Sequence, residues 1–189
     1  MKIVFHHSEK ARERDLARVF LKGADRHGHE AEARELCASP DVSGYDLGCF
    51  VGVKSKRIFQ MHQAAGIPLL IFDKGYVRTR TAGARVWEYW RLSLNAHQPT
   101  ETTLGRFKMP PDRWNALGIE LAPWRKRGHQ IVIAGSSAKY HDFYGLPNPS
   151  EWAANLVEDI RQHSDRPIVY RPKPSWKDAR RIAGTTWSG

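Results

Sequence analysis

Two short apolar runs, Ile131-Val-Ile-Ala134 and Ile168-Val-Tyr170, decide the fold of this chain. Each has the length of a buried strand and ends abruptly in polar and cationic residues, 135–141 after the first run and 171–177 after the second. The segment between them, residues 149–163, has apolar side chains at the spacing of an amphipathic helix. A strand, a helix and a second strand in this order predict an open α/β sheet, which binds ligands at the carboxyl ends of its strands.

The first half of the chain shows the same alternation of strands and helices. Ser8 is a candidate N-cap for the first helix, and Gly28 is a candidate terminator. Strands that alternate with helices predict a parallel sheet with right-handed crossovers. The expected strands are residues 2–7, 30–36, 45–53, 67–72 and 87–94, and the expected helices are residues 9–27 and 55–65.

We interpret the chain as α/β, with Rossmann-like parallel sheets in two parts. Residues 1–97 form an N-terminal Rossmann-like domain, residues 98–126 an ordered connector broken by prolines, and residues 127–189 a partial second α/β unit. In the second unit Asn148 can cap a helix, and Pro149 suits the first helical position.

The charge of the chain points to its partners. The net charge is +10 at pH 7 with a sequence pI of about 9.9, and most of the excess lies after residue 66. This balance favours nucleic acid, nucleotides or phosphorylated sugars as partners, although it also fits a basic protein that binds none of them. No apolar run is long enough to span a membrane, and Cys37 and Cys49 lack the spacing of metal ligands. We therefore expect a protein of a reducing cytoplasm without a metal site.

Polar side chains gather where the predicted strands end. In a parallel sheet these ends share one edge, and the cations and hydroxyls there suit a phosphate or diphosphate. A histidine or carboxylate at this edge is a candidate general base, which gives His7 and Asp73. Polar loops that hold no ligand are the alternative interpretation. The candidate ligand-binding residues at this edge are Lys54, Lys74, Ser136, Ser137, Lys139, Arg171 and Lys173.

A second cluster mixes tryptophan and arginine between residues 78 and 114. Arg78 and Arg91 belong to it and are candidates for contacts with phosphate, while the indole rings could stack on bases. The same composition also fits a buried layer between two domains.

Four segments of the chain, residues 72–76, 89–100, 133–141 and 166–176, read FDKGY, YWRLSLNAHQPT, IAGSSAKYH and RPIVYRPKPSW. They resemble a group of bacteriophage-encoded proteins that are similar to glycosyltransferases of the GT-B type, which have two Rossmann-like domains. The resemblance covers most of the chain from residue 67 onward. It implies a GT-B-like N-terminal domain on the acceptor side and a C-terminal domain on the donor side, with a nucleotide sugar bound between them.

By this resemblance the chain is a glycosyltransferase-like phage protein, acting in the cytoplasm of an infected bacterium. It would transfer a sugar from a nucleotide-diphosphate sugar to a hydroxyl acceptor, with modified phage DNA as a candidate, and it would need no cofactor beyond this donor. Proteins of this architecture continue with further strands and helices, so we expect residues 127–189 to hold only part of the donor domain. The resemblance places His7, Asp73 and Lys74 on the acceptor side, and Ser136, Ser137, Arg171 and Lys173 against the donor diphosphate.

Two other interpretations stay open at this point. One is a non-catalytic protein that binds nucleic acid or a nucleotide on a Rossmann-like scaffold, with an affinity that falls steeply with salt. The other is a homo-oligomer in which a partner chain completes the sheet near the C-terminus, since an unpaired sheet edge invites pairing.

Overall fold

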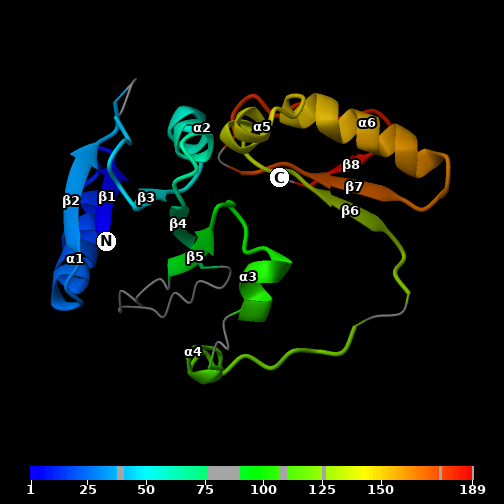
Figure 1. The fold of residues 1–189 in the computed structure, drawn as a ribbon. Helices are drawn as coiled ribbons and strands as arrows, with labels where there is room; N and C mark the ends of the chain where they lie inside the picture. The colour runs from blue at the N-terminus through cyan, green and yellow to red at the C-terminus, as the bar shows by residue number, and fades with distance from the viewer. Residues whose placement is uncertain (38–40, 76–89, 107–109, 125–126, 175, 189) are drawn as a thin grey trace. The chain divides into compact units, whose positions relative to one another are not determined.

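The structure is a computed structural model, and it describes residues 1–37, 41–75, 90–106, 110–124, 127–174 and 176–188. The chain divides into two compact units, Met1–Ile119 and Glu120–Gly189, which are described separately below. Figure 1 labels the helices and strands of both units. None of the helices in the described part of the chain has the length and apolar character needed to cross a membrane.

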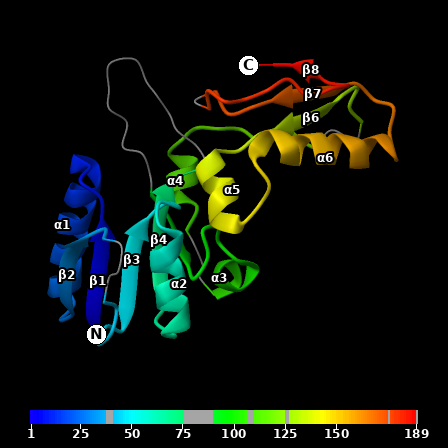
Figure 2. The ribbon, with the colours of Figure 1, turned by 90° about the horizontal axis from the view of Figure 1, so that it is seen from above.

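Unit 1 is built on a five-stranded sheet in the order β2-β1-β3-β4-β5. Four strands are parallel, which confirms the expected α/β class with a mostly parallel sheet, and Figure 2 shows them side by side. The fifth strand is antiparallel to β4, whereas we had expected an all-parallel sheet. The strands are β1 (Lys2–His7), β2 (Glu30–Glu35), β3 (Leu47–Val51), β4 (Leu69–Lys74) and β5 (Trp90–Leu94).

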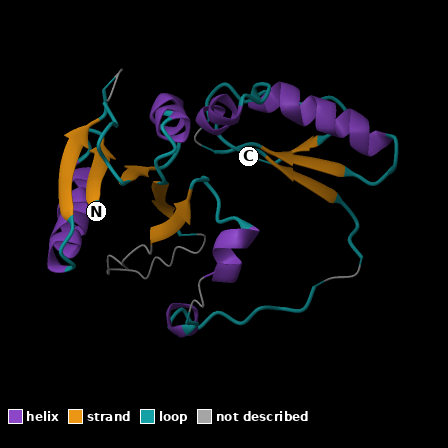
Figure 3. Cartoon of the chain, in the orientation of Figure 1, coloured by secondary structure: helices purple, strands orange, loops and turns teal. Residues whose placement is uncertain are grey.

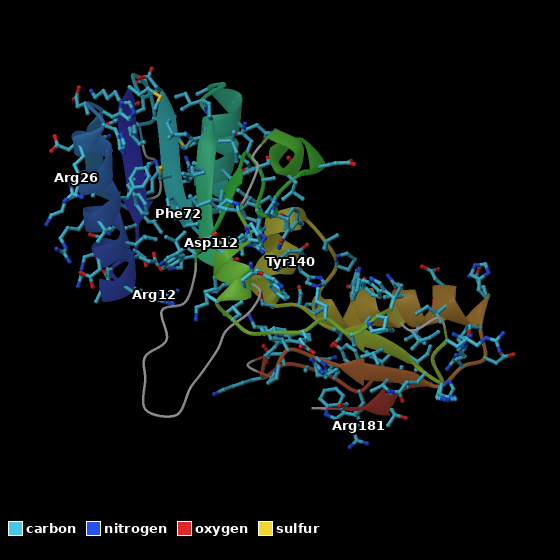
Figure 4. The ribbon with its side chains drawn as sticks, turned by 90° about the horizontal axis from the view of Figure 1, so that it is seen from below. Arg12, Arg26, Phe72, Asp112, Tyr140 and Arg181 are labelled. Atoms are coloured by element: carbon cyan, nitrogen blue, oxygen red, sulfur yellow. The ribbon has the colours of Figure 1, made fainter. Side chains whose placement is uncertain are left out.

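Helices on both faces of this sheet bury its core. Phe5 packs against Phe20 of α1, with ring centroids 5.5 Å apart, and the next residue of β1, His6, meets His62 of α2. Since successive strand residues point to opposite faces, α1 and α2 cover opposite faces of the sheet. Phe72, labelled in Figure 4, belongs to the same buried cluster as Phe5. The helices are α1 (Ala11–Arg26), α2 (Lys56–Ala64), α3 (Glu101–Arg106) and α4 (Asp112–Asn115).

The contact between His6 and His62 is a buried polar pair in an apolar layer. The two residues are 1% and 0% exposed, and their Nε2 atoms lie 3.1 Å apart. Gly48 of β3 makes room for the second ring, because a Cβ at this position would lie 2.1 Å from His62 Cε1. Burial, followed by the nearby His62, Arg34 and His7, lowers the pKa of His6 to about 4, and burial also lowers the pKa of His62. Both rings are therefore neutral at pH 7.

Unit 2 is a three-stranded parallel sheet in the order β6-β7-β8, and Figure 3 shows α6 along one side of it. Ile133, Ile168 and Tyr170 pack against Ala153 and Val157 of this helix. The unit thus contains the two strands and the helix that the sequence predicts, and it adds α5 and the two-residue β8. The elements are β6 (Ile131–Ala134), α5 (Ala138–Tyr144), α6 (Pro149–Arg161), β7 (Ile168–Arg171) and β8 (Thr186–Trp187).

The helix caps of unit 2 follow from the sequence. Asn148 Oδ1 accepts hydrogen bonds from the N–H groups of Ser150 and Glu151, both at 3.1 Å, and Pro149 occupies the first turn of α6. Gly145 ends α5 with a φ of 65°, a conformation that glycine adopts without strain. The connector expected at residues 98–126 contains α3 and α4, and unit 1 extends through both of them to Ile119.

Candidate functional site

The sheet of unit 1 has its topological switch point between β1 and β3. From β1 the chain passes through α1 to β2 on one side, while β3 and β4 lie on the other side. In open α/β sheets, ligands bind outside the carboxyl ends of the two strands at such a point. Here the residues that follow these strand ends are His7 and Ser8 after β1, and Lys54 after β3.

A buried carboxylate, Glu13, organises this switch point. Glu13 is 2% exposed, and its Oε2 accepts hydrogen bonds from the Ser8 N–H (3.1 Å) and the Ser8 hydroxyl (2.7 Å). Its Oε1 forms an ion pair with the Lys54 ammonium, which also donates to Ser8 Oγ at 3.2 Å. Ser8 was expected to cap α1, but the helix begins at Ala11 after Lys10 without a side-chain cap. The Ser8 hydroxyl is instead committed to Glu13.

His7 is held beside this cluster with a defined orientation. Its Nδ1 lies 3.1 Å from the backbone carbonyl oxygen of Ser8, and a carbonyl oxygen can only accept. When the ring is neutral, Nδ1 therefore carries the proton and Nε2 carries the lone pair. A lone pair held in this way is suited to accept a proton from a ligand hydroxyl.

Asp73, near the end of β4, is fixed by three residues that follow it in the chain. Its Oδ2 accepts from His97 Nε2 at 2.8 Å and from Arg91 Nη2 at 3.2 Å, while its Oδ1 accepts from the Lys74 N–H at 2.7 Å. Burial acts to raise the pKa of Asp73, but the hydrogen bonds from His97 and Lys74 and the charge of Arg91 outweigh it, so that its pKa is lowered. A carboxylate with a lowered pKa is a weak general base.

Arg91 is tied into the same cluster. Its side chain is only 10% exposed, and its guanidinium also donates to the His97 carbonyl (2.9 Å) and to Gln98 Oε1 (2.7 Å). These contacts join the antiparallel pair β4–β5 to the segment that follows it, so the geometry gives Arg91 a structural role. Arg78, the other arginine expected to contact phosphate, lies outside the described residues.

The strand ends of unit 2 bring two turns close together. The Gly135 N–H donates to the Arg171 carbonyl at 2.9 Å, and a Cβ on Gly135 would lie 3.2 Å from Pro172 Cα. Ser137 caps α5, where its Oγ accepts from the Tyr140 N–H at 3.3 Å, so that its hydroxyl proton is left to donate elsewhere. Ser136 Oγ is buried and has no hydrogen-bond partner among the described residues.

Three cations surround these turns and all face solvent. Within the described ranges, no ion pair or side-chain hydrogen bond involves Lys139, Arg171 or Lys173. The carboxyl edge of unit 2 therefore carries positive charge that no acid of the described chain neutralises. Cations and hydroxyl donors gathered at one edge can bind an anion, and a phosphate group most readily.

The predicted site residues thus fall into three groups. His7 and Lys54 each contact Ser8 at the switch point, and Asp73 pairs with Arg91. The serines and cations of residues 136–173 lie at the edge of unit 2. In the described part of the chain, no three His, Cys, Asp or Glu side chains gather as metal ligands. The sequence interpretation missed Glu13 and His97. The only signal for Glu13 was a carboxylate in the first turn of a helix.

Comparison with known proteins does not assign the chain to a family. No protein-family model matches the chain, and no curated protein matches it either. The resemblance to glycosyltransferases therefore stays a prediction, and the function has to be argued from the residues themselves.

Proposed function

We propose that the protein is a glycosyltransferase-like enzyme that binds the diphosphate of a nucleotide sugar at the carboxyl edge of unit 2. The observation that carries the proposal is the unneutralised charge of Lys139, Arg171 and Lys173 beside the serine turn after β6. Adjacent parallel strands bring the Gly135 and Arg171 turns together through a backbone hydrogen bond of 2.9 Å. The proposal therefore uses groups that the fold already holds side by side.

The chemistry of transfer explains why a cationic edge is useful. The acceptor oxygen forms a bond to the anomeric carbon of the sugar, while the bond from that carbon to the diphosphate oxygen breaks. The bonding electrons leave with the diphosphate, whose negative charge increases. Guanidinium and ammonium groups stabilise this charge more strongly in the transition state than in the bound donor, which is how they accelerate the reaction.

Sugar transfer also needs a base that takes the proton of the acceptor hydroxyl. We assign this role to His7, because its Nδ1 is held by the Ser8 carbonyl and its Nε2 lone pair is available. Asp73 is the weaker candidate, since Arg91 and His97 hold its carboxylate and its pKa is lowered. The positive charge of the chain suits an anionic acceptor, and DNA that carries hydroxylated bases meets both requirements.

A second candidate function is non-catalytic binding of a nucleotide or nucleic acid. It is favoured by the internal pairing in unit 1, where Glu13 and Asp73 are already committed to Lys54 and Arg91. A protein of this kind would use the edge of unit 2 in the same way but would turn over no donor.

Binding of uridine diphosphate, measured by calorimetry with the wild-type chain and two arginine variants, tests the site. We expect Arg171→Ala to weaken binding about tenfold or more, because a hydrogen bond to a charged group is lost. Arg166→Ala is the matched control, since Arg166 is also exposed but precedes β7 at the opposite end of the strand. Equal losses in the two variants, or no binding by the wild type at millimolar ligand, would refute the site.

Turnover then separates the two candidate functions. Labelled nucleotide sugars and hydroxymethylated DNA are incubated with the wild type and with His7→Gln. Sugar transfer by the wild type that falls in the variant supports the enzyme, and donor binding without transfer supports the binding protein.

A further inference from the structure

Tyr170 of β7 carries a buried hydroxyl that lacks a hydrogen-bond partner in the described part of the chain. The residue is 0% exposed, and its hydroxyl oxygen makes no hydrogen bond to any described residue. Buried polar atoms in folded proteins nearly always have a partner, so each exception calls for an explanation. Ser136 Oγ, in the turn after the neighbouring strand β6, is a second exception.

The hydroxyls of Tyr170 and Ser136 both lie at the carboxyl ends of the paired strands β6 and β7. Tyr170 pairs with Ile133 in the register of β6 and β7, and its hydroxyl would lie 3.5 Å from a Cβ placed on Gly135. Gly135 immediately precedes Ser136. The hydroxyl of Tyr170 thus lies directly beneath the turn at Gly135. The N–H of Gly135 donates to the Arg171 carbonyl.

A structural role through Ser150 is the simplest competing explanation. The Ser150 hydroxyl is near enough to oppose the effect of burial, which raises the pKa of Tyr170. However, the two hydroxyls do not meet with the geometry of a hydrogen bond. Ser150 Oγ accepts from the Arg180 N–H at 3.3 Å. The Tyr170 hydroxyl keeps its proton at neutral pH, so it is available as a donor.

We infer that Tyr170 and Ser136 form the inner end of the anion site of unit 2, where their hydroxyls donate to an oxygen of a bound phosphate or diphosphate. This inference rests on the proposed function, since it concerns the same edge of the sheet. Gly135 has no side chain, and the Tyr170 hydroxyl lies 3.5 Å from the position that a Cβ would take there. A ligand that reaches this hydroxyl displaces the turn, so binding includes a local rearrangement.

The test uses Tyr170→Phe, which removes one oxygen and leaves the ring. We expect the affinity for inorganic pyrophosphate to fall about tenfold, while the midpoint of urea unfolding stays the same or rises. An unsatisfied hydroxyl gives no stability to lose, so this combination separates a ligand donor from a structural one. Gly135→Ala is a second variant, and its methyl group is expected to weaken pyrophosphate binding by covering the hydroxyl.

Ser150→Ala distinguishes the competing explanation. If Tyr170→Phe and Ser150→Ala both lower the unfolding midpoint by similar amounts, the tyrosine bonds to Ser150 and the inference is wrong. It is also wrong if the wild type binds pyrophosphate and Tyr170→Phe binds it equally well, a result that leaves the proposed function standing. No binding of pyrophosphate or uridine diphosphate by the wild type overturns both proposals together.

Discussion

The carboxyl edges of the two sheets use their charges in opposite ways. In unit 1, Lys54 is paired with the buried Glu13, and Arg91 is paired with Asp73. In unit 2, no acid of the described chain pairs with Arg171 or its neighbouring lysines. The difference teaches that a cation at a strand end is not by itself a ligand-binding group. Only a charge that the fold leaves unneutralised remains to attract an anion.

The largest expected effect comes from breaking the buried pair of unit 1. Glu13→Ala removes the carboxylate that pairs with Lys54 and accepts from two donors of Ser8, and we expect the free energy of unfolding to fall by about 3–4 kcal/mol. Urea denaturation measures the loss, and hydrogen exchange in α1 locates it. Asp15→Ala is the control on the same helix, because Asp15 is exposed and lies 3.7 Å from Arg18 in a surface pair. A loss no larger than that of the control would show that the Glu13 cluster is not structural.

The next prediction compares how closely side chains and backbone pack around one glycine in each unit. Gly48→Ala brings a methyl group to 2.1 Å from the His62 ring, so we expect a loss of roughly 2–3 kcal/mol in the free energy of unfolding. Gly135→Ala meets its nearest atom at 3.2 Å and is expected to cost clearly less, because a shift of a few tenths of an ångström relieves the contact. Thermal unfolding of the two variants gives the comparison, and a larger loss in Gly135→Ala would contradict it.

Acid is expected to weaken unit 1 selectively. Burial and the neighbouring His62, Arg34 and His7 lower the pKa of His6 from 6.5 to about 4. Between these two pH values the unfolded chain binds a proton at His6 and the folded chain does not. The stability that this pair contributes is therefore complete above pH 6.5 and is lost as the pH falls toward 4. We expect a loss of about 3 kcal/mol over this window.

Urea midpoints at pH 7 and pH 4.5 measure this dependence. The double variant His6→Phe, His62→Leu is expected to flatten it, and replacement of the exposed His163 is the matched control. A pH dependence that persists in the double variant would assign the effect to other groups.

The smallest effect on stability is expected where the effect on binding is largest. Arg171 and Lys173 are exposed and have no partner in the described ranges, so replacing either by Ala changes the free energy of unfolding by less than about 0.5 kcal/mol. The same variants are expected to reduce the salt dependence of anion binding, since each removes one charge from the contact. If Arg171→Ala destabilised unit 2 as strongly as Glu13→Ala destabilises unit 1, the contrast between the two edges would disappear.

Local signals allowed much of the fold to be predicted from the sequence. The apolar runs at β1, β3 and β4 were visible because strands covered on both faces are apolar without interruption. The runs at β6 and β7 were equally apolar, although Val132 of β6 is 51% exposed. The start of α6 was visible because Asn148 and Pro149 are residues that suit a helix cap and a first turn. The direction of β5 was not visible, because the period of a strand is the same in parallel and antiparallel pairs.

The parts of the site that could not be predicted depend on contacts between residues that are distant in the sequence. Glu13 meets Lys54 and His97 meets Asp73 only after the strands have assembled, and no local pattern marks either pair. The α5 helix is only seven residues long and depends on contacts such as the 2.6 Å hydrogen bond between His141 Nδ1 and the Pro147 carbonyl. Lys54 and Arg171 looked equivalent as cations after strands, and only the folded chain distinguishes the paired one from the unpaired one.

The hydrogen bond between His6 and His62 has a direction, since one Nε2 must donate and the other must accept. A neutral imidazole carries a single N–H proton, so the ring that donates has a bare Nδ1 and the ring that accepts has its proton on Nδ1. The two buried rings are therefore different tautomers of the neutral imidazole. Nitrogen chemical shifts measured by NMR would identify which ring is which. Reversing the direction would require both rings to exchange their protons between their two nitrogens, although no atom of the backbone would need to move.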